Sequence, residues 1–271
     1  MKNRTAATPF ALWMILFTVI PMLIVFYFAF TDEAGRFTLG NIMHIGDYAG
    51  TYIDSIWMGA LATVICLVLA YPVALSISRH AEHMQRTMVL IVMLPMWMNF
   101  LLRTYAWMSL LEDQGLINRF LGLFGRQVHM INTDGAVVLG MVYNFLPFMI
   151  LPLYSVMAKM DGRIIEAAQD LGSNQFQVFR RLIFPMSAPG IVSGVTMVFV
   201  PAVSTFVISK LLGGSKYMMI GDVIDSMFMG NGCDYHVGAA LSLVLMVLML
   251  LCMSLMRRVD NGEDELGGMM A

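Results

Sequence analysis

The sequence predicts an all-α membrane protein with six transmembrane helices. Of its 271 residues, 59% are hydrophobic and only 13% are charged, which is too apolar for a soluble domain with a polar surface. Crossing roughly 30 Å of hydrocarbon takes about 20 apolar helical residues, because only a helix or a closed barrel satisfies its own backbone groups there. Six stretches qualify, none with the alternation of barrel strands: 10–30, 56–78, 87–111, 136–158, 187–211 and 238–256.

The first apolar stretch follows Lys2 and Arg4, as the apolar region of a secretory signal would. It is too long for such a region and no clear cleavage site follows, so we expect it to remain as a spanning helix. The connections between the stretches are short. We therefore expect residues 1–271 to form a single transmembrane domain.

The distribution of basic residues predicts that both termini face the cytoplasm. With six spans, alternate loops lie on the same side, and the side richer in Lys and Arg is cytoplasmic. The terminal side holds ten basic residues against five on the other. The ten are Lys2, Arg4, Arg79, Arg86, Lys159, Arg163, Arg180, Arg181, Arg257 and Arg258; the five are Arg36, Arg119, Arg126, Lys210 and Lys216.

The predicted outer loops also carry acidic residues, among them Asp54, Asp134, Asp222 and Asp225. A negatively charged mouth attracts cations. An acidic exterior is also what an excess of basic residues on the inside leaves behind, so the sequence keeps both interpretations open.

The longest cytoplasmic connection, 159–186, predicts a helix, a glycine turn and a second helix. A simple connection needs far fewer residues. Residues 163–171 favour helix, Gly172 suits the left-handed position after a helix, and Ser173 or Asn174 can cap the next one.

In the second helix, Phe176, Phe179 and Ile183 recur with helical spacing and predict an apolar stripe, and Pro185 is expected to end the helix. A compact pair of helices on the cytoplasmic face suits insertion into a groove on a partner protein. An amphipathic hairpin on the membrane surface is the alternative.

Two stretches in this connection carry a family resemblance. EAAQDLG at 166–172 and FPMSAPG at 184–190 resemble, in type, spacing and position, the EAA signature of permeases in binding-protein-dependent ABC importers. The resemblance implies the MetI-like ABC importer permease fold, with this loop docked on a separate ATPase. It assigns the ATPase-coupling role to Glu166, Ala167, Ala168, Asp170 and Gly172.

The same resemblance implies alternating access driven by a dimer of ATPase subunits, which binds ATP and Mg²⁺. It also implies a second permease, which we expect to be a paralogue, and an extracytoplasmic binding protein that delivers the solute. The expected location is a bacterial inner membrane, with the chain embedded in lipid.

The chain itself shows no sign of catalysis. Residues 213–216 read GGSK without the spacing of a phosphate-binding loop, and no nucleophile with its base or metal-ligand set stands out. Nucleic-acid-binding patterns are missing too. We expect a transport subunit that is not an enzyme, binds no cofactor or metal, and has no nucleic-acid partner.

Over most of its length the chain resembles the B-type permease of spermidine/putrescine importers. The resemblance is carried by LPMWMNFLLRTYAW at 94–107, by 141–161 and by 213–224, and it weakens at 36–52 and 260–271. It implies that the cargo is a polyamine. Related permeases share parts of these stretches, so another small solute is the alternative.

A polyamine site needs carboxylates for the ammonium groups and aromatic rings for the aliphatic stem. In the third predicted span, Trp97 and Tyr105 share one helical face, and Arg103 and Trp107 share another. Aromatic residues in membranes more often pack against other helices or anchor at the interface. Asp222 and Asp225 also suit a solvated loop. The candidate substrate path comprises Trp97, Arg103, Tyr105, Trp107, Tyr143, Tyr154, Asp222 and Asp225.

Arg103 lies eight residues inside the outer end of the third predicted span, roughly 12 Å deep. An unpaired charge is costly there, and an arginine in the path would repel a polycation. We therefore expect a structural or gating role, with Glu112 or Asp113 as acidic partner.

A stand-alone secondary transporter is the rival class. Such transporters often carry inverted repeats and acidic residues inside their spans. No Asp or Glu lies well inside a predicted span here, and no internal repeat is evident. The sequence favours the importer subunit.

Overall fold

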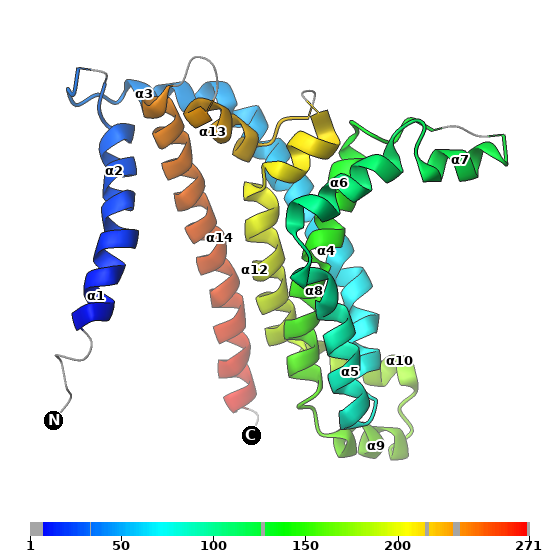
Figure 1. The fold of residues 1–271 in the computed structure, drawn as a ribbon. Helices are drawn as coiled ribbons and strands as arrows, with labels where there is room; N and C mark the ends of the chain where they lie inside the picture. Colours follow the sequence, from blue (N-terminus) through cyan, green and yellow to red (C-terminus); the bar gives the residue numbers. More distant parts are fainter. Residues whose placement is uncertain (1–7, 33, 126–127, 215–216, 230–233, 270–271) are drawn as a thin grey trace.

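The computed structural model describes residues 8–32, 34–125, 128–214, 217–229 and 234–269. Three helices form its centre, α4 (Ala49–Ser78), α8 (Asp134–Met157) and α12 (Ala188–Ser204). Helix α14 (Tyr235–Met269) runs beside α12, and α2 (Ile20–Ala29) stands outermost (Figure 1).

Shorter elements connect and flank these helices. They are α1 (Thr8–Met14), η2 (Ile15–Val19), α3 (Gly40–Met43), η3 (His44–Tyr48), α5 (Glu82–Met93), η4 (Leu94–Trp97), α6 (Phe100–Leu111), α7 (Leu116–Gly122), α9 (Gly162–Asp170), α10 (Gln175–Val178), η5 (Phe179–Ile183), α11 (Phe184–Met186), η6 (Ser209–Gly213) and α13 (Ile220–Met229).

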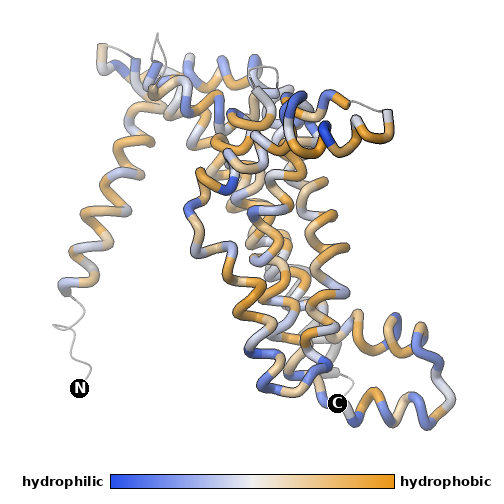
Figure 2. The backbone as a smooth tube through the Cα atoms, turned by 45° about the vertical axis from the view of Figure 1, so that its right-hand side comes forward, coloured by the Kyte–Doolittle hydropathy of each residue, from blue (hydrophilic) through white to orange (hydrophobic). Residues whose placement is uncertain are grey.

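The two ends of the bundle differ. Helices α9 and α10 lie at one end, here called the coupling end, together with the start of α1 and the end of α14; α3, α7 and α13 lie at the other, the far end (Figure 1). Hydrophobic residues follow the middle of the helices and hydrophilic ones gather toward both ends (Figure 2). This arrangement suits a bundle that crosses a membrane.

Within the described residues, four helical stretches are long and apolar enough to cross a membrane: Leu12–Ala29, Gly40–Ser78, Asp134–Met157 and Tyr235–Met256. Two bent pairs, Glu82–Trp97 with Phe100–Gly122 and Gln175–Met186 with Ala188–Ser204, bring the number to six if each pair counts as one span. Six spans are therefore compatible with the fold. Part of the charge asymmetry that orients them rests on Lys2, Arg4, Arg126, Lys216 and the side chains of Arg257 and Arg258, which lie outside the described residues.

The third predicted span, 87–111, is not one helix. The chain bends by 85° between the α5–η4 segment and the α6–α7 segment. Pro95 starts a short 3₁₀ turn, and the side chain of Asn99 then caps α6 by accepting a hydrogen bond from Leu101 N at 2.9 Å. A proline and a capping residue so close together end one helix and start another.

The fifth predicted span, 187–211, is too long at its far end. Helix α12 ends at Ser204 because Thr205 is extended, and η6 forms a separate turn. At the other end, Pro185 lies one residue before the end of the helical run 175–186, close to the end expected from the sequence. It occupies the first turn of α11, which tolerates its missing N–H, and the chain bends by 62° at the α11–α12 junction.

Small residues let α12 approach α8 closely. A Cβ at Gly190 would lie 3.1 Å from the carbonyl oxygen of Pro152 and 3.2 Å from Leu153 Cα. One turn later, Gly194 faces Met149, whose sulfur would lie 2.6 Å from an added Cβ. Close approach of this kind holds helices together where lipid is as apolar as the side chains.

The far end is tied to the bundle by two buried hydrogen bonds from α4. The hydroxyl of Tyr52 donates to Leu241 O in α14 at 2.6 Å. The hydroxyl oxygen of Ser55 accepts from Ile220 N, the first residue of α13, at 2.8 Å. Both bonds satisfy polar groups away from water; the first holds α14 against α4, and the second fixes where α13 begins.

We predict that Gly190→Val destabilises the protein by about 1–3 kcal/mol, the usual cost of overpacking. Its neighbours are backbone atoms, which cannot swing aside. The control is Gly50→Val in α4, where nothing lies within 4 Å of an added Cβ. Thermal unfolding in detergent measures both, and equal unfolding temperatures for the two variants would contradict the close packing of α12 on α8.

Candidate functional site: a coupling segment and two far-end cavities

The segment 159–186 at the coupling end, here called the coupling segment, forms the predicted helix, glycine turn and helix. Asp161 caps α9 by accepting from Arg163 N at 3.0 Å. After α9, Gly172 has a φ of +86°, a left-handed conformation that is costly for residues with a Cβ. Gly172 N donates to Gln169 O at 2.9 Å and Ser173 N to Ala168 O at 3.0 Å, the pair of bonds of a Schellman cap.

The second half of the coupling segment starts with a reciprocal cap. Gln177 N donates to Asn174 Oδ1 at 2.8 Å, and Asn174 N donates to Gln177 Oε1 at 3.0 Å. Of the two predicted capping residues, Asn174 is therefore the one used. With both sides of the turn capped, the segment has a defined shape before any partner binds.

The apolar residues of the coupling segment divide into two groups. Val178 and Ile183 are buried in the bundle, whereas Leu171 and Phe176 expose 88% and 68% of their surface beside the turn. The predicted stripe of Phe176, Phe179 and Ile183 is thus wrong as a single face, because Phe176 points away from the bundle. The segment is anchored on one side and offers two bare apolar side chains on the other.

The predicted coupling residues all belong to this segment. Glu166, Ala167, Asp170 and Gly172 are exposed, and Ala168 is half-buried. Helix α9 has no buried residue at all. The whole helix is available to a partner.

Arg103 is buried in α6, with its guanidinium 5.9 Å from the centre of the Tyr143 ring. The expected acidic partner is absent among the described residues, where Nε and Nη1 of Arg103 have no hydrogen-bond partner. Asp113 lies 2.7 Å from His129 Nδ1 instead. Arg103 lies eight residues before the end of α6, in the first turn after the bend.

Of the predicted path residues, the structure brings together Arg103, Trp107 and Tyr143. The Trp107 and Tyr143 rings meet edge to face at 5.4 Å, joining α6 to α8. Tyr154 lies apart and donates from its hydroxyl to Gln85 Oε1 at 2.9 Å. Trp97 and Tyr105 are exposed on either side of the bend, so they do not share a helical face.

Asp222 and Asp225 lie on α13 at the far end, in different environments. Asp222 is buried and accepts from Met219 N at 2.9 Å, which caps its own helix. Burial raises the pKa of the Asp222 carboxyl; hydrogen bonds and the nearby Lys210 offset only part of this. The Asp225 carboxylate lies 3.2 Å from Lys210 Nζ, and most of the Asp225 side chain is covered.

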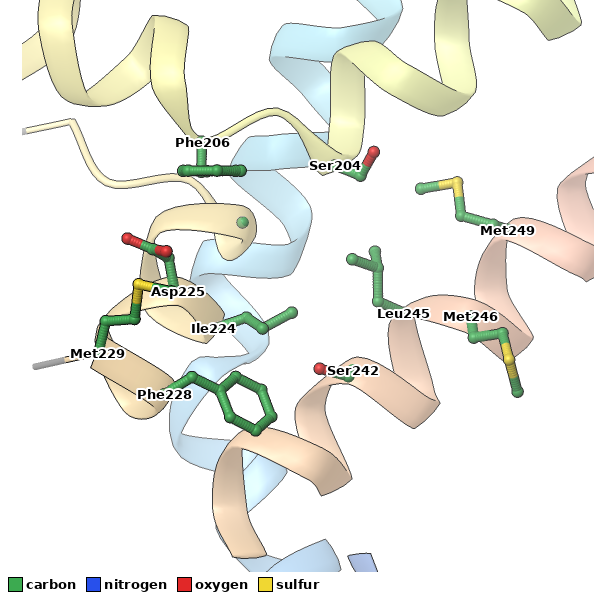
Figure 3. Close-up of a pocket in the computed structure, with 11 residues that line it drawn as sticks. Ser204, Phe206, Ile224, Asp225, Phe228, Met229, Ser242, Leu245, Met246 and Met249 are labelled. Atoms are coloured by element: carbon green, nitrogen blue, oxygen red, sulfur yellow. The ribbon is translucent and has the colours of Figure 1, made fainter. Parts of the chain in front are cut away.

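Asp225 also borders a cavity of about 590 Å³ between α12, α13 and α14. Phe206 and Asp225 lie on one side of it, and Leu245 and Met249 face them across the space (Figure 3). The cavity is mostly apolar, and its one carboxylate is paired with Lys210. A cation could use Asp225 only by displacing that lysine.

A second far-end cavity, of about 340 Å³, has the composition that a diamine needs. It lies between the outer turns of α4 and the start of α8, and its lining includes the carboxylates of Asp54 and Asp134 and the rings of Trp57 and Tyr217. Neither carboxylate forms an ion pair with a basic residue of the described chain. From the sequence, Asp54 and Asp134 were predicted only to add negative charge to the outer loops. Their positions just before two predicted spans could have indicated a site at the outer ends of those helices.

An apolar helical bundle with a capped, exposed segment at one end and two cavities bordered by carboxylates at the other is the arrangement of a membrane transport subunit. A family model described as binding-protein-dependent transport system inner membrane component matches residues 1–263. The chain belongs to this family, whose members are multi-pass permease subunits rather than enzymes.

Curated relatives confirm the resemblance drawn from the sequence. The spermidine/putrescine transport system permease protein PotB of Haemophilus influenzae is 38% identical over 260 residues, covering 92% of this chain and 91% of its own. The protein of the same name from Escherichia coli is 36% identical over 268 residues, covering 94% and 97%.

Solved structures confirm the fold. A bacterial ABC transporter for import of the acidic polysaccharide alginate contains a chain with a TM-score of 0.74 at 17% identity, with 94% of both chains covered. An inward-facing MetNI methionine ABC transporter matches with a TM-score of 0.60 at 17% identity, covering 78% of this chain and 94% of the other. The predicted MetI-like permease fold is correct.

We predict that Asp222→Asn unfolds at a higher temperature than the wild type at neutral pH. The amide oxygen still accepts the bond from Met219, and no charge is buried. Because burial raises the pKa above its value of 3.8 in an unfolded chain, ionisation of Asp222 opposes folding. This contribution is absent below pH 3.8 and complete above the raised pKa.

Thermal unfolding in detergent at neutral and at acid pH measures this difference. It should shrink as the pH falls. Asp47→Asn, at an exposed carboxylate near His44, is the control. A variant less stable than the wild type at neutral pH would show that the charge on Asp222 stabilises α13.

Proposed function

We propose that this chain is one of two permease subunits of an ATP-driven importer that carries spermidine or putrescine into the cell. Two relatives that are 36% and 38% identical over more than nine-tenths of the chain are named as spermidine/putrescine transport system permeases. The solute arrives on an extracytoplasmic polyamine-binding protein, and ATP and Mg²⁺ bind to a separate ATPase dimer.

The coupling segment is the observation that carries the proposal. Its turn is fixed by caps on both sides, and Leu171 and Phe176 stand bare beside it. Two exposed apolar side chains on a rigid knob suit a groove on a soluble protein. Glu166 and Asp170 lie on the same exposed helix and can contact basic groups at the rim of such a groove.

Charge supports a cytoplasmic position for the coupling end and therefore for both termini. Described basic residues at this end include Arg79, Arg86, Lys159, Arg163, Arg180 and Arg181. Cytoplasmic loops carry such an excess. An ATPase fed by cytoplasmic ATP would meet the coupling segment on this side.

The Asp54–Asp134 cavity is the better candidate for receiving a polyamine at the far end. Two carboxylates suit two ammonium groups, and the Trp57 and Tyr217 rings suit the stem between them through apolar and cation–π contact. The two acids first considered, Asp222 and Asp225, are engaged in a helix cap and an ion pair. They remain candidates for a later step, after Lys210 has moved.

Reconstitution tests the proposal. The chain in liposomes with its ATPase, sister permease and binding protein should take up spermidine only when ATP is present. Uptake by this chain alone would favour a secondary transporter. A complex whose ATPase responds to another solute but not to polyamines would assign a different cargo.

In that system we predict that Gly172→Val abolishes most ATP-driven uptake while the bundle stays folded. Its φ of +86° costs a β-branched residue about 1–2 kcal/mol, although the space around it is open, so the turn loses its shape. Gly162→Val is the control, because that position is equally open and has no positive φ. Equal uptake by the two variants would contradict a role for the turn.

We also predict that Asp54→Asn and Asp134→Asn raise the polyamine concentration for half-maximal uptake. A hydrogen bond to a charged group contributes about 1.5–3 kcal/mol, so each change should cost roughly tenfold or more. Asp47→Asn, which does not line the cavity, is the control. If the double variant transports like the wild type, the cavity is not on the path.

A further inference from the structure

The junction of the coupling segment with the bundle is a single buried residue. Ser187 joins α11 to α12 where the chain bends by 62°, and it is wholly buried. Ser187 N donates to Ile183 O at 2.9 Å, and Ile191 N donates to Ser187 O at 3.0 Å. Ser187 thus keeps both of its backbone hydrogen bonds at the bend, so a displacement of α11 is passed to α12 rather than absorbed by a loose loop.

A tyrosine on another span binds the side chain at this junction. Tyr71 of α4 lies in a buried hydrogen bond with Ser187, 2.8 Å from hydroxyl to hydroxyl. The Ser187 hydroxyl uses its proton on Phe184 O at 2.8 Å. Since a hydroxyl has one proton, Tyr71 is the donor and Ser187 the acceptor. The bond thus ties α4 to the bend itself.

The Tyr71 ring also contacts the coupling segment directly. It meets the Phe179 ring edge to face at 5.5 Å and the Phe184 ring at 6.1 Å. Phe179 and Phe184 lie 6.4 Å from each other. These three rings join α4 to η5 and α11, and we expect them to move together because aromatic contacts are specific in geometry.

The tie reaches α4 at a weak point. Pro72, next to Tyr71, lies inside α4, where it lacks the N–H that would bond the preceding turn. A helix bends most readily at such a position. A force applied through Tyr71 therefore acts where α4 can respond.

We propose that Tyr71 is a positioning residue for coupling: its hydroxyl holds the bend at Ser187 and passes the movement of the coupling segment to α4. The inference rests on the proposed function, because coupling has meaning only if an ATPase moves this segment. The ring alone fills the space; the hydroxyl supplies the directional link.

The test uses the assembled transporter in proteoliposomes, and the readout is polyamine transported per ATP hydrolysed. Tyr71→Phe keeps the ring and removes the donor, and Ser187→Ala removes the acceptor. Each should lower the transport ratio about fivefold, the factor given by one hydrogen bond of typical strength. The double variant should be no worse than Ser187→Ala, because that change already breaks the Tyr71–Ser187 bond, together with the Ser187–Phe184 bond.

The matched control is Tyr52→Phe. It removes an equally buried tyrosine hydroxyl bond from the same helix, at the far end and away from the bend. Its transport ratio should stay at the wild-type value even if its unfolding temperature falls. A ratio lowered equally in Tyr71→Phe and Tyr52→Phe would overturn the inference, because the effect would then be general loss of stability.

Wild-type ratios in both Tyr71→Phe and Ser187→Ala would also overturn it, while leaving the proposed function intact. If the wild-type complex shows no ATP-driven uptake, the proposed function fails and this inference fails with it. The two failures are therefore distinguishable in one set of vesicles.

Discussion

Hydrocarbon offers the backbone no hydrogen bonds, and the rest of this structure depends on that constraint. It forces the spans to be helical and makes hydroxyls inside them turn back to their own helix, as Thr63 does to Gly59 O at 2.7 Å. It also limits where a helix can stop. At the α5–α6 bend the side chain of Asn99 replaces the missing partner, and at Ser187 the backbone bonds continue through the turn. The backbone at each bend is thus held by an identifiable residue, Asn99 or Ser187, and these residues mark the bends between straight helices.

The packed helices and the coupling segment have different mechanical properties. Helices α4, α8 and α12 pack through small residues and form the part that is hard to deform. The coupling segment enters this core through Val178, Ile183 and the Tyr71 cluster, while its outer side stays bare. Under the proposed function, in which an ATPase moves the coupling segment, such a division would let one end of the molecule receive the movement and the other change the shape of a cavity without local unfolding. The far-end helix α13, fixed by Ser55 on α4, belongs to the output side.

Local signals allowed the sequence to predict the coupling segment well. The glycine, the capping residues and the apolar anchors lie within about one helical hairpin, so neighbours along the chain decide the shape. The third span was predicted as one unbroken helix because a hydropathy window averages over Pro95 and Asn99, which together break the helix. Arg103 was matched to acids nearby in sequence, but the bend sets it over Tyr143, a partner on another helix. The Asp54–Asp134 cavity could not be foreseen either, because only the packing of α4 against α8 brings those carboxylates together.

The contact of Met149 with Gly194 has a further consequence. A thioether on an unbranched stem has several rotamers of similar energy, and glycine presents a smooth surface without a side chain to lock them. At this contact α8 and α12 therefore pack closely, but no branched side chains interlock there to fix their relative position. The Met149 side chain can therefore change rotamer and keep its sulfur against Gly194 when the spacing of the two helices changes slightly. Met149 thus fills the space beside Gly194 and also adapts to small changes in helix packing.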